Sequence, residues 1–165
     1  MTWAIHDPAV ADAEEMGRVH VTVWKQAYAG LMPSDYLDSL DPAAFAASWR
    51  ERLTHPVPDV HTWIARDEHG ICAISTSGPA RDADAPTDWQ LYAINVLARA
   101  QGTGVADALV RRAIGDRAAY LWVVDGNERA QAFYRRHRFV DDGGRAELAP
   151  TGTLEVRMSR GHLAT

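Results

Sequence analysis

Residues 89–110 read WQLYAINVLARAQGTGVADALV and contain three successive patterns. Residues 89–96 are short and apolar, which is typical of a buried strand. A loop with glycines at Gly102 and Gly104 follows, and apolar residues then recur at helical spacing over residues 103–114. This order of strand, glycine loop and helix predicts an anion cradle. The glycines let the backbone approach a ligand, and the first free N–H groups of the helix point at it.

Two familiar nucleotide-binding loops do not fit this stretch. A P-loop needs a Gly-Lys-Ser/Thr sequence after a four-residue gap, and no lysine stands here. A dinucleotide-binding turn needs glycine or alanine at the position of Asp107. The pattern that remains is R/Q-x-x-G-x-G/A, which Arg99, Gly102 and Gly104 satisfy. An ordinary helix N-terminus is the alternative interpretation of this hexapeptide.

Length and composition limit the classes of protein to which this chain can belong. The 165 residues fit one domain spanning residues 1–165, and 47% apolar with 24% charged residues is ordinary for a globular protein. A net charge of −5 argues against nucleic acid or an anionic membrane as partner. The single cysteine, Cys72, excludes an internal disulfide, and the first residues do not resemble a signal peptide. We therefore expect a cytoplasmic protein.

The remaining elements follow from the same periodicities. Strands are expected at residues 2–5, 61–66, 71–77, 89–96, 118–124, 139–148 and 154–159. Helices are expected from Pro8 to near Gly30, within 31–40, and at 42–53, 103–114 and 127–137. Strand–helix–strand passages favour parallel pairing and hairpins favour antiparallel edges. The predicted fold class is therefore α/β, with a mixed central sheet of about six to seven strands flanked by helices.

A second motif lies downstream, in NERAQAFYRRHRF at residues 127–139. Asn127, Ala130 and Tyr134 are three and seven residues apart and share one helix face. This N-x-x-A-x-x-F-Y pattern and the glycine loop together resemble the GNAT superfamily, the acetyl-coenzyme A-dependent N-acetyltransferases. The predicted order of elements is also that of the family. The resemblance covers nearly the whole chain and is strongest over residues 89–139.

The resemblance implies a binding site for acetyl-CoA, with the glycine loop as the pyrophosphate loop between the fourth strand and the following helix. The implied loop contacts are Arg99, Gln101, Gly102, Thr103, Gly104, Val105 and Ala106. In the family the preceding strand splays at a bulge, exposing N–H groups to the pantetheine arm and thioester. By position this bulge falls on Ile94, Asn95 and Val96.

Asn127 and Tyr134 complete the implied coenzyme site. The resemblance places the Tyr134 hydroxyl beside the thioester sulfur, as general acid, because a phenol with a pKa of about 10 is protonated at neutral pH. Packing of a half-buried aromatic ring on the sheet is the alternative for Tyr134. A helix cap is the alternative for Asn127, and it is compatible with coenzyme binding.

The base and the acceptor are left open by the sequence. Asp88, six residues before Ile94, is a candidate base because some family members carry a carboxylate on this strand; a solvated loop aspartate is the alternative. His20, His61 and Tyr92 are further candidates. Trp24 and Tyr28 are candidates for the lining of the acceptor pocket, within a looser resemblance to one bacterial GNAT group over residues 19–40. No metal site is expected, because the histidines are scattered and there is no cysteine cluster.

We therefore expect an N-acetyltransferase that transfers an acetyl group from acetyl-CoA to a primary amine of a small molecule or peptide, by direct attack on the thioester. Homodimers are common in the family. A non-catalytic acetyl-CoA-binding module is the alternative, and Tyr134 beside Asn127 favours the enzyme. One departure concerns Arg138, which stands where the family usually has glycine. There an arginine must adopt a left-handed conformation at some cost, or the helix must end differently.

Overall fold

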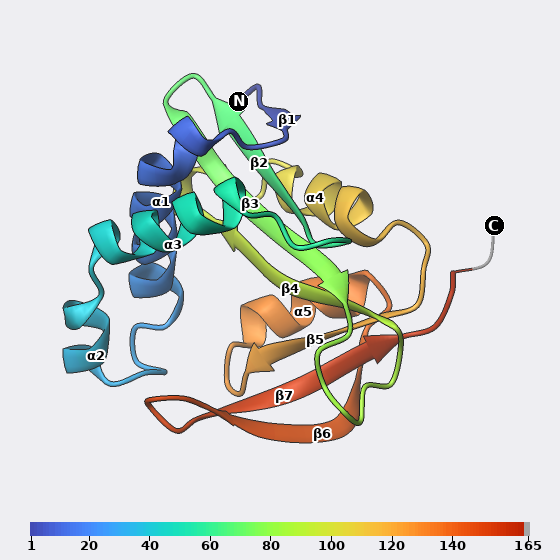
Figure 1. The fold of residues 1–165 in the computed structure, drawn as a ribbon. Coiled ribbons are helices and arrows are strands. Elements are labelled where there is room, and N and C mark those ends of the chain that lie inside the picture. Colours follow the sequence, from blue (N-terminus) through green and yellow to red (C-terminus); the bar gives the residue numbers. More distant parts are fainter. Residues whose placement is uncertain (164–165) are drawn as a thin grey trace.

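A seven-stranded mixed sheet in the order β1-β2-β3-β4-β5-β7-β6 runs through the molecule (Figure 1). The structure is a computed structural model and describes residues 1–163. The strands are β1 (Ala4–His6), β2 (His61–Asp67), β3 (Gly70–Pro79), β4 (Trp89–Val96), β5 (Ala119–Val124), β6 (Val140–Leu148) and β7 (Thr153–Arg160). The predicted α/β class and strand number are confirmed, and every expected strand overlaps an observed one.

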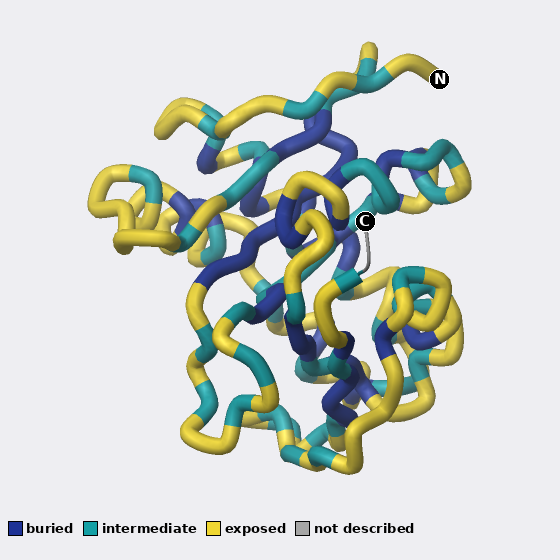
Figure 2. The backbone as a smooth tube through the Cα atoms, turned by 90° about the vertical axis from the view of Figure 1, so that its right-hand side faces the viewer, coloured by how far each residue is buried: buried dark blue, intermediate teal, exposed yellow. Residues whose placement is uncertain are grey.

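Helices cover both faces of the sheet. The helices are α1 (Ala13–Ala27), α2 (Ser34–Ser39), α3 (Pro42–Thr54), α4 (Val105–Ile114) and α5 (Glu128–Arg136), with short 3₁₀ turns η1 (Val10–Asp12) and η2 (Ala98–Ala100). One apolar cluster joins α1 and α3 to one face, and another joins α4 and α5 to the other. Figure 2 shows buried residues along the central strands and exposed residues in the surrounding loops. No helix within residues 1–163 is long and apolar enough to span a membrane.

The first long helix begins later than predicted. Residues Val10–Asp12 form a 3₁₀ turn, and the α-helix starts at Ala13 rather than at Pro8. The Asp12 carboxylate accepts a hydrogen bond from the Ala9 N–H at 2.8 Å. The carboxylate that stabilises this helix start is therefore Asp12 and not Asp7.

A gap between β4 and β5 is the feature that positions the site. These strands form the parallel pair of the sheet and are in register only at Gln90 and Tyr120, near the start of both. Beyond that point β4 continues to pair with β3, and β5 with β7. The gap therefore opens toward the ends of β4 and β5, and α4 and α5 both begin on that side.

A β-bulge in β4 lies earlier than expected. Thr76 faces Ala93 and Ser77 faces Leu91, which leaves Tyr92 as the extra residue. The predicted bulge at Ile94, Asn95 and Val96 is wrong, because these three pair regularly with Ser75, Ile74 and Ala73. The Tyr92 hydroxyl donates to the Pro79 carbonyl at 2.6 Å and lies where a Cβ on Gly78 would stand. Because Gly78 has no Cβ, it leaves room for the Tyr92 side chain beside the bulge.

The backbone conformation of Arg138 is seen at the end of α5. Its φ is 66°, so the arginine adopts the left-handed conformation that glycine would favour. Its N–H donates to the Arg135 carbonyl at 3.0 Å, and the Phe139 N–H donates to the Tyr134 carbonyl at 3.1 Å. The Phe139 and Tyr134 rings are in edge contact, with centroids 6.0 Å apart. These contacts form a Schellman motif with its apolar contact, despite the missing glycine.

Candidate active site

The glycine loop presents bare backbone at the start of α4. Gly102 and Gly104 have φ values of +76° and +85°, and no atom lies within 4 Å of a Cβ built on either. The Ala108 N–H makes a helical hydrogen bond with the Gly104 carbonyl, so the N–H groups of Val105 and Ala106 precede that bond. Open space beside unpaired N–H groups at the positive end of a helix fits a diphosphate.

The polar side chains of the loop form hydrogen bonds with other atoms of the protein and so stabilise the loop's conformation. The Arg99 guanidinium donates to the Asp67 carboxylate at 3.0 and 3.2 Å and to the Ile71 carbonyl at 3.2 Å. This guanidinium lowers the pKa of Asp67. Gln101 Nε2 donates to the Val96 carbonyl at 3.4 Å, and Thr103 Oγ1 donates to the Ala100 carbonyl at 2.6 Å. The loop therefore faces a ligand with its main chain rather than with these side chains.

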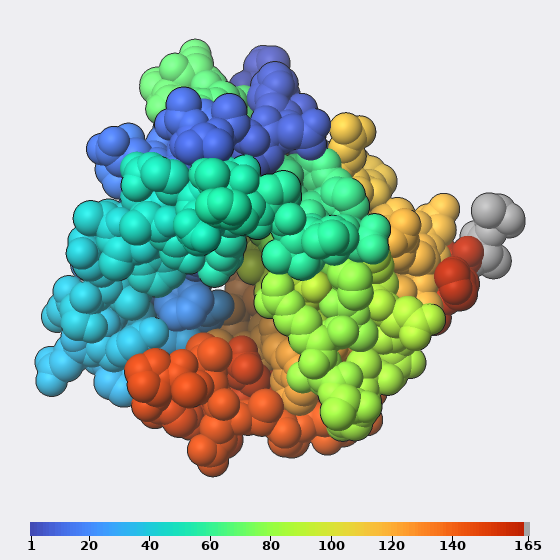
Figure 3. All heavy atoms as spheres, in the orientation of Figure 1, coloured from blue at the N-terminus to red at the C-terminus, as the bar shows by residue number. Residues whose placement is uncertain are grey.

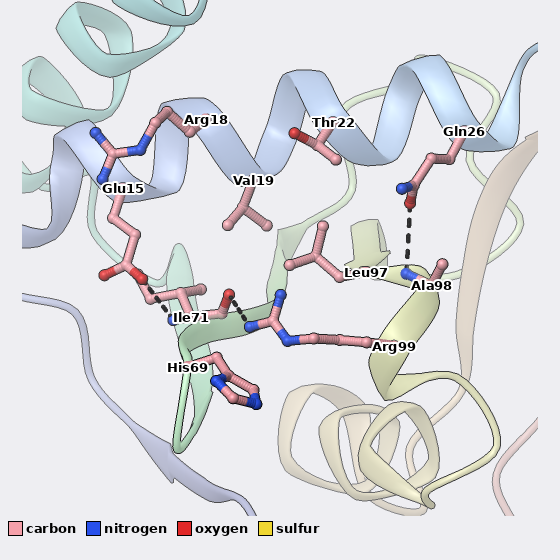
Figure 4. A pocket seen from close by; sticks show the side chains of 10 residues that line it. All are labelled: Glu15, Arg18, Val19, Thr22, Gln26, His69, Ile71, Leu97, Ala98 and Arg99. Carbon is pink, nitrogen blue, oxygen red and sulfur yellow. Dashed lines mark hydrogen bonds between the residues drawn. The ribbon is translucent and has the colours of Figure 1, made fainter.

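Figure 4 shows a pocket beside the start of this loop, with α1 crossing above it. Arg99 extends along the floor of an open cavity of about 570 Å³ between α1 and the end of β4, and its guanidinium reaches Ile71. Gln26 of α1 accepts a hydrogen bond from the Ala98 N–H at 3.4 Å. These contacts tie the loop to the opposite helical layer and fix its position at the mouth of the gap.

The edge of β4 offers N–H groups to the gap. The Leu97 N–H donates to the Cys72 carbonyl on β3 at 2.9 Å. Because N–H groups alternate in direction along an antiparallel strand, those of Ile94 and Val96 point away from β3 and into the gap. The N–H of Asn95 points to β3 instead, and its side chain is buried. Of the three predicted residues, Ile94 and Val96 are thus positioned to meet a ligand.

α5 brings Asn127 and Tyr134 to the other side of the gap. The Asn127 Oδ1 accepts from the Ala130 N–H at 3.2 Å, which confirms its interpretation as a helix cap. Tyr134 packs against the apolar cluster of α4 and α5, and its hydroxyl has no hydrogen-bond partner within residues 1–163. Burial raises the pKa of Tyr134 above its ordinary value, and the neighbouring Tyr28 adds to the shift. The phenol is therefore held protonated.

Trp24 and Tyr28 lie together on the opposite side of the sheet, as predicted for neighbours on one helix face. Their rings are in edge contact, with centroids 5.3 Å apart. Both pack against a cluster that includes Met32 and Leu37 from the α2 region and Val124 at the end of β5. Figure 3 shows a hollow on this face, bounded by α1, α3, the 79–88 loop and the β6–β7 hairpin.

Glu155 of β7 belongs to this group and was not predicted. It lies directly opposite Val124 in the β5–β7 pair, so its side chain shares the face on which Val124 meets Tyr28. Burial raises the pKa of Glu155, and the Asp82 carboxylate raises it further. Burial raises the pKa of Tyr28 to about 12, and the negative charge of Glu155 contributes a smaller part of this increase. The alternation of residues 154–158 indicates only that Glu155 points away from the side chains of Val156 and Met158. The tertiary structure shows that it lies on the same face of the sheet as Tyr28.

The other candidate bases lie elsewhere or are engaged. Asp88 is exposed and precedes the Gln90–Tyr120 pair, at the closed end of the gap, so the structure does not bring it to Tyr134. His61 is exposed at the start of β2. His20 packs among Trp24, Phe45 and Trp49, and burial lowers its pKa to about 4. The described residues 1–163 contain no group of three His, Cys, Asp or Glu side chains that could hold a metal ion.

Comparisons with known proteins bear on this arrangement. The family profile of the acetyltransferase (GNAT) domain matches residues 58–141. The uncharacterized N-acetyltransferase YuaI of Bacillus subtilis is 28% identical over 130 residues, which is 74% of this chain and 72% of YuaI.

Two solved structures share the fold over nearly their whole lengths. The PaiA N-acetyltransferase of Thermoplasma acidophilum, solved in complex with coenzyme A, has a TM-score of 0.72 at 15% identity and covers 98% of this chain and 100% of its own. A structure described as histone acetyltransferase HPA2 and related acetyltransferase, from Corynebacterium glutamicum, has a TM-score of 0.69 at 23% identity and covers 100% and 99%.

Proposed function

The chain belongs to the acetyltransferase (GNAT) family, and we propose that it transfers the acetyl group of acetyl-CoA to a primary amine of a small molecule or peptide. One observation carries the proposal. Tyr134 of α5, whose hydroxyl makes no hydrogen bond within residues 1–163, and Tyr28, at the end of α1, approach each other at the gap between β4 and β5. The half-buried Glu155 of β7 lies opposite Val124 of β5, on the side of the sheet that Tyr28 occupies. The glycine loop lies at the mouth of that gap.

The chain's backbone would hold the donor. The N–H groups of Val105 and Ala106 face the space beside Gly102 and Gly104, where a diphosphate can approach. The N–H groups of Ile94 and Val96 line the edge of β4 and are available to a pantetheine arm and to the thioester oxygen. Asn127 fixes the start of α5 on the far side of the gap. Bound here, acetyl-CoA supplies the reactive thioester.

Two side chains of the site would transfer protons, one as the base and one as the acid. Glu155, whose raised pKa makes it a better proton acceptor than an ordinary glutamate, takes a proton from the incoming ammonium. The neutral nitrogen forms the C–N bond as the C–S bond breaks, and Tyr134 donates its proton to the leaving sulfur. The second proton lost by the nitrogen restores the phenol. Overall, an ammonium and the thioester give an amide, a thiol and one released proton.

Release of free thiol from acetyl-CoA, measured across a panel of primary amines, tests the proposal. We expect amine-dependent thiol release together with stabilisation of the fold by coenzyme A in a thermal melt. Stabilisation without thiol release for any amine would assign the chain to the non-catalytic binders. Absence of any effect of coenzyme A on the melting temperature would contradict both the acetyltransferase and the non-catalytic binder.

A further inference from the structure

We propose that Arg52 and Arg81 form a subsite for an anionic group, a carboxylate or phosphoryl group, carried by the acceptor at a distance from its reacting amine. This inference rests on the proposed acetyl transfer and deepens it by naming the acceptor class. Arg52 lies in the last turn of α3, and Arg81 lies in the loop that follows β3. Both line an open cavity of about 630 Å³.

Aromatic rings hold both guanidinium groups in place. The Arg52 guanidinium carbon lies 4.9 Å from the centroid of a Trp49 ring, and that of Arg81 lies 3.5 Å from the Tyr92 centroid. Such stacking orients a planar guanidinium and leaves its N–H edge available to a ligand. Tyr92 is itself fixed by its hydrogen bond to Pro79. The cavity is therefore lined by two pre-oriented cations.

Neither arginine of this pair has an ion-pair partner in the part of the chain that the structure describes. Within residues 1–163 neither guanidinium makes an ion pair or a side-chain hydrogen bond, although the Asp7 side chain also lines the cavity. Partial burial and the positive charge of Arg81 both lower the pKa of Arg52. By contrast, the guanidinium groups of Arg66 and Arg157 each pair with two carboxylates. Two like charges that face one cavity without an anion favour an anionic ligand between them.

A series of ring contacts, which begins at the buried Trp49, connects this subsite to the tyrosines. Trp49, on which Arg52 stacks, contacts His20, and His20 contacts Trp24. Trp24 in turn contacts Tyr28. Tyr28, the C-terminal cap of α1, follows His20 by eight residues, which corresponds to about 12 Å along a helix. An acceptor that reaches both ends carries its anionic group on the order of 10 Å from its amine, as in a tripeptide with a free C-terminal carboxylate, which spans about 10 Å when extended.

A first experiment detects the subsite without turnover. Inorganic phosphate and acetate are titrated into the protein while the Nε–H signals of its arginines are followed by NMR. We expect saturable shifts of the Arg52 and Arg81 signals and none for Arg50, which lies on α3 outside the cavity. Equal shifts at Arg50, or no saturation at Arg52 and Arg81, would overturn the subsite.

A second experiment links the subsite to the acceptor. Acetyl transfer is measured with a tripeptide, with its C-terminal amide, and with a phosphorylated primary amine. For the doubly substituted R52A/R81A protein we expect KM to rise at least tenfold for whichever anionic acceptor is used. KM for acetyl-CoA should be unchanged, and the Arg50→Ala control should leave all values unchanged. Equal effects on the tripeptide and on its amide would overturn the inference.

The two experiments separate the two proposals. Anion-dependent shifts at Arg52 and Arg81 without thiol release would keep the subsite and remove acetyl transfer. Thiol release without such shifts would keep acetyl transfer and remove the subsite. The ratio of tripeptide to phosphorylated-amine KM identifies whether a carboxylate or a phosphoryl group is the preferred anion.

Discussion

Tyr28 at the end of α1 and Tyr134 in α5 approach the gap between β4 and β5 from opposite faces of the sheet, and the first helps to raise the pKa of the second. A complete sheet would separate the two helical layers. The phenols come together only because β4 and β5 stop pairing after Gln90 and Tyr120. The gap thus brings together side chains from the two helical layers.

Replacement of Tyr134 by phenylalanine tests the general acid. Because no residue within 1–163 hydrogen-bonds the Tyr134 hydroxyl, we expect its loss to leave the melting temperature nearly unchanged. Loss of a general acid typically costs about 10²- to 10⁴-fold in rate, so kcat should fall within that range with the KM for acetyl-CoA preserved. Steady-state thiol release measures both constants. An unaltered kcat would remove the acid role.

Replacement of Gly104 by alanine tests the pyrophosphate loop. A left-handed alanine costs roughly 1 kcal/mol of stability, and a shift of the backbone to relieve that strain would misdirect the N–H groups of the cradle. We expect at least a tenfold loss of coenzyme A affinity by calorimetry. The matched control is Gly143→Ala, since Gly143 has a φ of +91°, lies in β6 and likewise has no atom within 4 Å of a built Cβ. It should lose similar stability with no loss of affinity.

Replacement of Glu155 by glutamine separates function from stability. The folded-state pKa of Glu155 is raised, so its contribution favours folding below its unfolded pKa and is lost as pH rises through the folded value. At pH 7 the substitution should therefore increase the free energy of unfolding. The same substitution should lower kcat/KM and remove the limb on which kcat/KM rises with pH through the pKa of Glu155. A pH profile identical to that of the parent protein would exclude Glu155 as the base.

Replacement of Arg138 by glycine should stabilise the protein. Relief of the left-handed strain is worth about 1–2 kcal/mol, and the added freedom of the unfolded chain offsets about 0.4–1 kcal/mol of it. We expect a net gain of about 0.5–1 kcal/mol in chemical unfolding. Arg129→Gly, an exposed position inside α5, should instead destabilise by about 1 kcal/mol. Equal destabilisation by both would show that Arg138 is unstrained.

His20 should make stability depend on pH. Its pKa falls from 6.5 in the unfolded chain to about 4 in the folded protein, so the unfolded state binds more protons between these values. The free energy of unfolding should therefore decrease as pH drops from 6.5 toward 4, by on the order of 3 kcal/mol. Urea unfolding at several pH values measures the slope. The His20→Phe variant, which keeps a ring in the aromatic cluster, should show a shallower slope.

The sequence by itself determined the strands, most helix boundaries and the glycine loop, because these depend on local periodicity and on conformations that few residues adopt. Gly102 and Gly104 have the left-handed φ values that their loop requires. Asn127 begins α5 as a cap, which neighbouring residues alone dictate. The family resemblance rested on the same local patterns, and the family profile confirms it.

Only the tertiary structure decided which groups meet at the gap. The β4 bulge lies at Tyr92, which packs over Gly78 of the neighbouring strand β3. No local sequence pattern encodes this contact. Asp88 precedes one predicted strand and Glu155 lies within another, yet Asp88 is exposed at the closed end of the gap and Glu155 is half-buried beside Tyr28. Their difference comes from strand order and from the side of the sheet that each faces. Desolvation and charge proximity, which set proton affinity, are properties of that three-dimensional arrangement.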